Sequence, residues 1–178
     1  MLNSTPTRRL TSAALFVALG VLLPQLFHAI PNFGTVFSPM HLPVLACGLI
    51  CGWKYGLLCG LLTPALSSAL TAMPPAMLLP GMICELAVYG LVGGLLFFKV
   101  QTGKRLADIY LALVPAMLLG RLFAGLMNGL FFRAGDFTFQ MFLAGYFVTS
   151  LPGILIQLIL VPILMLALEK TRVIQYGA

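Results

Sequence analysis

Two ionisable side chains lie inside long apolar segments, where charge is hardest to accommodate. Glu85 lies about eight residues into the segment 77–98, and Arg121 lies near the middle of the segment 108–132. An ionisable group within a membrane costs several kcal/mol unless it is paired or hydrated, so it usually faces the interior of a helix bundle. The two residues therefore either form a structural ion pair between helices, or at least one of them contacts a ligand.

Further polar residues fall at the same predicted depth. Tyr89 follows Glu85 by one helical turn, and Asn128 follows Arg121 by two turns, so each pair shares a helix face. Small-molecule sites combine an apolar wall with a few placed polar groups. Together with the outer ends of the second and sixth apolar segments, the predicted ligand-binding residues are Met40, His41, Glu85, Tyr89, Arg121, Asn128, Tyr146 and Ser150.

Two polar residues of the apolar segments are not assigned to this site. His28 lies at the outer end of the first segment, where an imidazole at the membrane interface is ordinary. Gln157 lies deeper in the last segment, where we expect it to form an interhelical hydrogen bond.

Motifs for several other chemistries are absent from the sequence. The fragment 102–105 (TGKR) lacks both the upstream glycine and the following Ser or Thr of a phosphate-binding loop. There is no HExxH, no GxSxG, no pair of intramembrane aspartates and no internal repeat of the kind found in secondary transporters. Cys47 and Cys51 are one helical turn apart, but no second pair completes a metal site. We therefore predict no catalytic residue, metal or cofactor in this chain.

Six apolar segments must position these residues. The 178 residues are 61% hydrophobic and 8% charged, with a mean hydropathy of +1.07, which excludes an ordinary soluble domain. Six spans of about 20 residues leave only short loops. We predict one all-α integral membrane domain over residues 1–178, without a cleaved signal peptide. Its six transmembrane helices are expected at about residues 10–30, 40–51, 55–72, 77–98, 108–132 and 139–168.

Two of these spans are expected to be irregular. The segment 40–51 is short and contains glycine, and the segment 55–72 contains Pro64. Irregular backbone at membrane depth is tolerated where it is buried or lines a cavity, so the loops 31–40 and 73–75 are predicted to border the site. The alternative is that small residues simply permit close helix packing, which we favour for the runs GLICG, GLLCG and YGLVGG.

The basic residues predict the orientation of the bundle. Lysines and arginines at membrane-protein loops favour the cytoplasmic side, so both termini are predicted to be cytoplasmic. Arg133 falls in a gap on the opposite side. Because orientation accounts for the net charge of +6, no nucleic-acid partner is predicted. The eight residues on the predicted cytoplasmic side are Arg8, Arg9, Lys54, Lys99, Lys104, Arg105, Lys170 and Arg172.

The segment 38–94 carries a more specific pattern. It contains SPMHLPVLACGLICGWKYGLLCGLLTPALSSALTAMPP, followed by MICELAVYGLVGGLL. With its MH(I/L)PVL entry, G-x3-G span, P-x-L-x-S segment, MPP turn and EL-x2-YG helix, it resembles the substrate-binding S components of energy-coupling factor (ECF) vitamin transporters. The resemblance covers nearly the whole chain and does not specify one vitamin.

This resemblance implies a subunit that captures a water-soluble vitamin or cofactor precursor at an outward-facing pocket in a bacterial plasma membrane. It implies a transmembrane T component and two ATPase subunits as partners, with ATP used by those ATPases. The T component would dock on small alanines of the first span, where Ala14 and Ala18 match an AxxxA pattern. The loop 31–39 would cover the pocket, and the whole subunit would topple in the membrane to release its substrate.

Other functions remain open at this point. The chain could be a small membrane enzyme or an assembly subunit, or a solitary carrier that needs no ATPase partners. A structural dimerising protein is disfavoured, because it would not need Glu85 and Arg121 within the membrane. One acid and one base would suit a zwitterionic or amphoteric ligand, unless the two residues pair with each other. A pyridoxine-like compound, pantothenate, α-ribazole and a queuosine precursor remain candidates, although aromatic stacking on Tyr89 and Tyr146 disfavours pantothenate.

Overall fold

The computed structural model describes residues 6–26, 33–133 and 135–170, and all regular structure in these ranges is helical. Helix lengths follow the apolar segments of the sequence. The helices are α1 (Pro6–Leu26), α2 (Phe33–Phe37), α3 (His41–Cys51), α4 (Trp53–Thr71), α5 (Leu79–Lys99), α6 (Arg105–Met127), α7 (Phe139–Leu143) and α8 (Leu151–Lys170), with two π-helices, η1 (Asn128–Phe132) and η2 (Ala144–Thr149).

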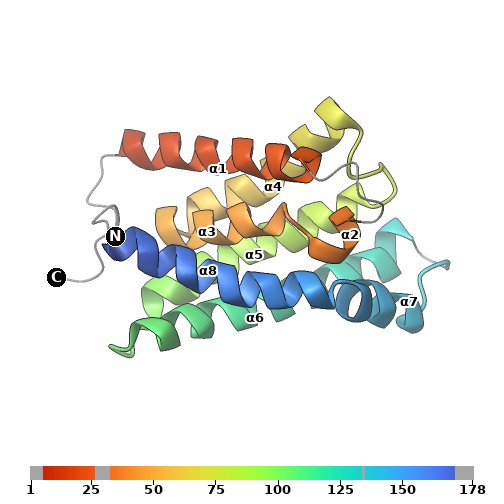
Figure 1. Cartoon of the computed structure of the whole chain (residues 1–178). Coiled ribbons are helices and arrows are strands. Elements are labelled where there is room, and N and C mark those ends of the chain that lie inside the picture. The colour runs from red at the N-terminus through yellow and green to blue at the C-terminus, as the bar shows by residue number, and fades with distance from the viewer. Residues whose placement is uncertain (1–5, 27–32, 134, 171–178) are drawn as a thin grey trace.

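The long helices form one bundle in which successive members alternate in direction (Figure 1). The start of α1, the α3–α4 and α5–α6 connections and the end of α8 lie at one end, which carries most of the described basic residues. Four helical stretches are long and apolar enough to cross a membrane: α1, α5, the continuous stretch Arg105–Phe132 and α8. The count of six spans and the cytoplasmic position of the termini stay predictions.

The helix boundaries differ from the predicted segments at several points. The predicted irregular loop 31–39 contains the short helix α2. Pro64 lies within α4, so the interruption expected there is wrong, and the helix continues past the missing N–H donor. Residues 27–30 of the first predicted span, residues 31–32 and Arg172 lie outside the described residues.

Close packing of glycines holds α3, α4 and α5 together. A Cβ atom at Gly56 would lie 2.5 Å from the carbonyl oxygen of Gly90 on α5 and 2.6 Å from the Cα of Gly48 on α3. Only residues without a side chain allow three backbones to approach this closely. The packing role predicted for the glycine runs is therefore confirmed. As a result α3 is central, with ten of its eleven residues buried.

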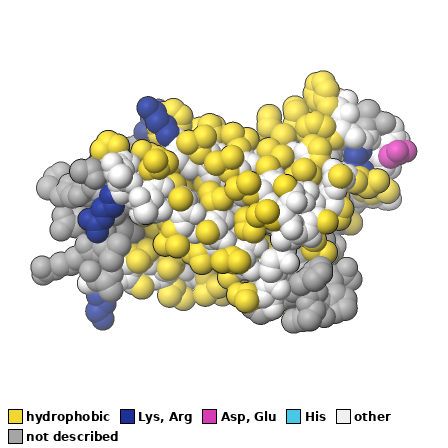
Figure 2. All heavy atoms as spheres, turned by 90° about the horizontal axis from the view of Figure 1, so that it is seen from above, with side chains coloured by type: hydrophobic (Ala, Val, Ile, Leu, Met, Phe, Trp, Pro, Cys, Tyr) yellow, Lys and Arg dark blue, Asp and Glu magenta, His cyan; other side chains and the backbone are white. Residues whose placement is uncertain are grey.

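The outer surface of the bundle is apolar. Large side chains such as Leu15, Leu22, Leu70 and Leu126 are more than half exposed. Figure 2 shows hydrophobic side chains across the middle of one face, with Lys and Arg side chains concentrated toward one end. Soluble monomers rarely expose so many large apolar side chains, whereas such a surface suits contact with lipid.

Candidate functional site

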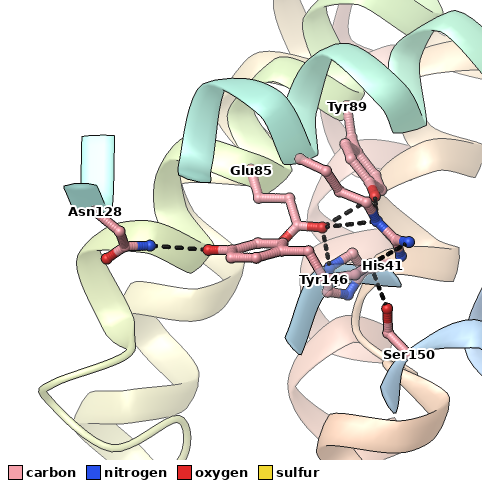
Figure 3. A network of polar contacts seen from close by, with 7 residues as sticks. His41, Glu85, Tyr89, Asn128, Tyr146 and Ser150 are labelled. Carbon is pink, nitrogen blue, oxygen red and sulfur yellow. Dashed lines mark hydrogen bonds and ion pairs between the residues drawn. The ribbon is translucent and has the colours of Figure 1, made fainter. Parts of the chain in front are cut away.

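A carboxylate lies at the centre of a buried polar cluster between α3, α5 and α6. The Oε1 atom of Glu85 lies 3.4 Å from His41 Nε2 and 3.4 Å from Arg121 Nε. The hydroxyl of Tyr89 donates to the same oxygen at 3.0 Å and accepts from Arg121 Nε at 2.8 Å (Figure 3). None of these four residues is more than 5% exposed. The cluster is therefore sealed from solvent, and its charged groups are neutralised by one another.

Tyr146 on η2 extends this cluster toward α6 and η1. Its carbonyl oxygen accepts from Arg121 Nη1 at 2.7 Å and from the hydroxyl of Ser150 at 2.6 Å. Its hydroxyl accepts from Asn128 Nδ2 at 2.8 Å, as Figure 3 shows. Both Tyr146 and Asn128 belong to π-helical turns, which are rare and frequently occur at functional sites.

Two features of the local sequence bring these side chains together. Glu85 and Tyr89 are four residues apart on α5, so both point from one face of that helix. Gly120 precedes Arg121 on α6 and lets that helix approach closely: a Cβ atom there would meet the ring of Tyr89 and lie 2.9 Å from the carbonyl oxygen of Glu85. Gly81 similarly accommodates the amide of Asn128. The glycines of the helix interfaces thus determine how close the polar groups come.

The structure brings seven of the eight predicted site residues into this one cluster: His41, Glu85, Tyr89, Arg121, Asn128, Tyr146 and Ser150. Met40 immediately precedes His41 but belongs to the hydrophobic core. Among the described residues the cluster is buried, and the outward-facing pocket stays a prediction. Ligand contact by any of these residues stays a prediction.

The contact between Glu85 and Arg121 decides one of the alternatives left open by the sequence. The two residues pair with each other, so the argument for a zwitterionic ligand no longer holds. Removing one member of such a buried pair would leave an uncompensated charge. A ligand that enters this cluster must therefore leave Glu85 and Arg121 paired or replace the contacts that each one loses.

No group of three or more His, Cys, Asp or Glu residues in the described chain could hold a metal ion. Polar groups that could meet a ligand nevertheless extend beyond the predicted set. Gln157 on α8 is 0% exposed, and neither its Oε1 nor its Nε2 has a hydrogen-bond partner among the described residues. The interhelical hydrogen bond that we expected for Gln157 is therefore wrong. Its only signal in the sequence is an amide in an otherwise apolar helix.

The helix expected to dock a partner presents its alanines outward. Ala14 and Ala18 are exposed on α1, whereas Ala13 and Gly20 are buried against the bundle. The exposed pair lies on a face that no other described helix covers. Docking of a partner on that face stays a prediction.

A family comparison identifies the class of protein. The family model of the substrate-specific component of ECF transporters matches residues 8–165, a range that includes the whole polar cluster. The chain belongs to this family. It is therefore a membrane protein, an S component that binds substrate for a transport system. A comparison with curated proteins finds no match.

Proposed function

We propose that this S component binds a water-soluble vitamin or cofactor precursor next to the Glu85 cluster and delivers it to a T component and two ATPase subunits. The observation that carries this proposal is the number of elements that meet there. The cluster draws polar groups from α3, α5, α6, both π-helices and Ser150, the residue that precedes α8. A purely structural contact between two helices would need only one ion pair.

Binding would exchange hydrogen bonds within the cluster for hydrogen bonds to the substrate. We expect Tyr146 to be the point of exchange, because it joins the charged core to Asn128 and lies on the short element η2, directly after α7. If α7 and η2 moved away from the bundle, they would expose polar groups that are already positioned to bind a substrate. Energy for release would come from ATP hydrolysis by the partner ATPases, and the apolar outer surface would allow the subunit to rotate within lipid.

The proposal predicts that the chain carries its substrate through purification. We expect the protein, purified in detergent from cells grown in rich medium and then heated, to release one vitamin-like compound in about stoichiometric amount, identified by mass spectrometry. Uptake of that compound by cells should require the T component and both ATPases. Uptake without these partners would support a solitary carrier, and chemical conversion of the compound by the isolated chain would support an enzyme.

A second expectation concerns the exposed alanines of α1. Replacing Ala14 and Ala18 with leucine should reduce co-purification of the T component by about tenfold or more, equivalent to ~1.4 kcal/mol, because bulky side chains prevent close helix approach. Substrate binding by the isolated subunit should not change. The matched control is Ala167→Leu, an exposed alanine on α8. Equal losses in both proteins, or none in either, would contradict a docking role for this face of α1.

A further inference from the structure

An apolar groove lies on the surface of the bundle, lined by the end of α6, by η1 and by the segment that leads into α7. Its volume is about 400 Å³. Gly125 and Gly129 line it one helical turn apart: a Cβ atom at Gly125 would overlap the ring of Phe142, and one at Gly129 would lie 3.7 Å from Phe137. Leu126, a further lining residue, is 54% exposed, so the groove opens to the surroundings of the bundle.

The groove lies at one end of a candidate membrane span. The continuous helical stretch Arg105–Phe132 is long and apolar enough to cross a membrane, and its last turns line the groove. This end of the stretch and α7 lie opposite the start of α1 and the end of α8 (Figure 1). The lipid headgroups begin where an apolar span ends. The groove is therefore at the level of lipid acyl chains, and Arg133, the next residue, is at the level of headgroups.

The side chain of Arg133 lies against one wall of the groove. Its guanidinium carbon is 5.7 Å from the centre of the ring of Phe137, which lines the groove. The backbone of this turn is closed by hydrogen bonds, because the N–H groups of Asp136 and Phe137 both donate to the Arg133 carbonyl at 3.1 Å. Attraction to a ring face leaves the N–H donors of a guanidinium to bond elsewhere.

No carboxylate of the described chain forms an ion pair with Arg133. The sequence contains only four acidic residues. Glu85 belongs to the buried polar cluster, and Asp108 and Glu169 lie at the other end of the bundle. Asp136 belongs to the same turn as Arg133, but it is exposed. The charge of Arg133 is therefore open to an anion from outside the protein.

We propose that the groove binds an acyl chain of a membrane phospholipid whose phosphate pairs with Arg133. The volume of the groove is within the range of about 300–1,000 Å³ that is typical of small-molecule sites. An apolar chain matches walls of Leu and Phe, and the planar fork of guanidinium donors matches two phosphate oxygens. A water-soluble substrate would leave its polar groups without partners against these walls. This site is additional to the proposed function and does not depend on which substrate is carried.

The test is native mass spectrometry of the full-length protein, delipidated in detergent, which measures the affinity for the first bound lipid. The probes are phosphatidylglycerol and diacylglycerol with the same acyl chains. We expect phosphatidylglycerol to bind about fivefold or more tightly, the factor that one basic residue contributes near a membrane surface. Arg133→Gln should abolish this difference. Gly129→Leu should weaken phosphatidylglycerol about tenfold or more, because the added side chain fills the groove.

Lys54→Gln and Gly145→Leu are the matched controls. Lys54 lies over the ring of Trp53 at 5.5 Å, at the other end of the bundle, and a Cβ atom at Gly145 would meet nothing within 4 Å. Both variants should bind phosphatidylglycerol as the unmodified protein does. Arg133→Gln decides the test by itself if Gly129→Leu impairs folding.

Three results would overturn the inference: equal binding of the two lipids, an unchanged difference between them in Arg133→Gln, or an equal loss of affinity in the controls. Dimers in the same spectra that Gly129→Leu dissociates would assign the groove to a second copy of the chain instead. A co-purified vitamin-like compound that only Gly129→Leu loses would assign it to the substrate.

Discussion

Replacement of Arg121 by methionine is expected to lower the free energy of unfolding by about 3–5 kcal/mol, because it leaves the carboxylate of Glu85 buried without its cationic partner. Glu85 is 5% exposed, so water cannot take the place of the guanidinium. Arg121 also donates to the hydroxyl of Tyr89 and to the carbonyl of Tyr146, and both acceptors would lose that donor. The measurement is thermal unfolding of the detergent-solubilised protein.

A double variant separates the loss of charge balance from the loss of packing. Glu85→Gln combined with Arg121→Met removes both charges, and we expect it to recover much of the stability lost in Arg121→Met alone. Arg133→Met is the matched control, because this arginine is half-buried at the end of η1 and lies over the ring of Phe137 at 5.7 Å. Its effect should stay below about 1 kcal/mol. Equal losses for the two arginines, or additive losses in the double variant, would contradict a coupled buried pair.

The membership of this cluster could be predicted because lipid penalises polar groups so strongly. A carboxylate or guanidinium inside an apolar segment must face other protein, and residues one or two turns away on the same helix face must follow it inward. Glu85, Tyr89, Arg121 and Asn128 were found in this way. The family resemblance, taken from the segment 38–94, was confirmed by the match over residues 8–165.

The connections within the cluster could not be predicted in the same way. Whether Glu85 pairs with Arg121 depends on the separation of α5 and α6, which the contact of Gly120 with Tyr89 determines. The hydrogen bonds of the Tyr146 carbonyl and the π-helical turns are features of the backbone, so a pattern of side-chain types does not predict them. A pattern of side chains shows which groups avoid lipid but does not show which groups meet.

The prediction for Gln157 was wrong, because the sequence suggested a hydrogen bond that the structure does not contain among the described residues. A lone amide deep in an apolar helix is usually satisfied by a neighbouring helix, so the sequence favoured a structural role. Satisfaction depends on which groups stand opposite, and the described residues around Gln157 provide none. The interruption expected at Pro64 was wrong for a related reason: Gly56 and Gly60 hold the turns before the proline against α3 and α5, and α4 continues as a helix through it.

The same glycine contacts predict a second large effect. Replacing Gly90 by valine should destabilise the bundle by more than about 3 kcal/mol and prevent recovery of folded protein, because a side chain there cannot be accommodated by moving a rotamer. A Cβ atom at Gly90 would overlap the backbone of Gly56, whose Cα would lie at 2.9 Å. Shifting α5 away from α4 would also displace Tyr89, the residue next to Gly90, and with it the hydrogen bond that its hydroxyl accepts from Arg121 on α6.

Gly93→Ala on the same helix tests whether the effect belongs to this contact. A Cβ atom at Gly93 would lie 3.6 Å from the Cβ of Ala116, which is an ordinary packing distance. Alanine also favours helix over glycine, so the change in stability should stay within about 1 kcal/mol. Size-exclusion chromatography and thermal unfolding in detergent compare the two proteins. Equal behaviour of both variants would mean that α4 and α5 can separate without loss of the fold. The position of Glu85 would then have to be maintained by the polar cluster itself.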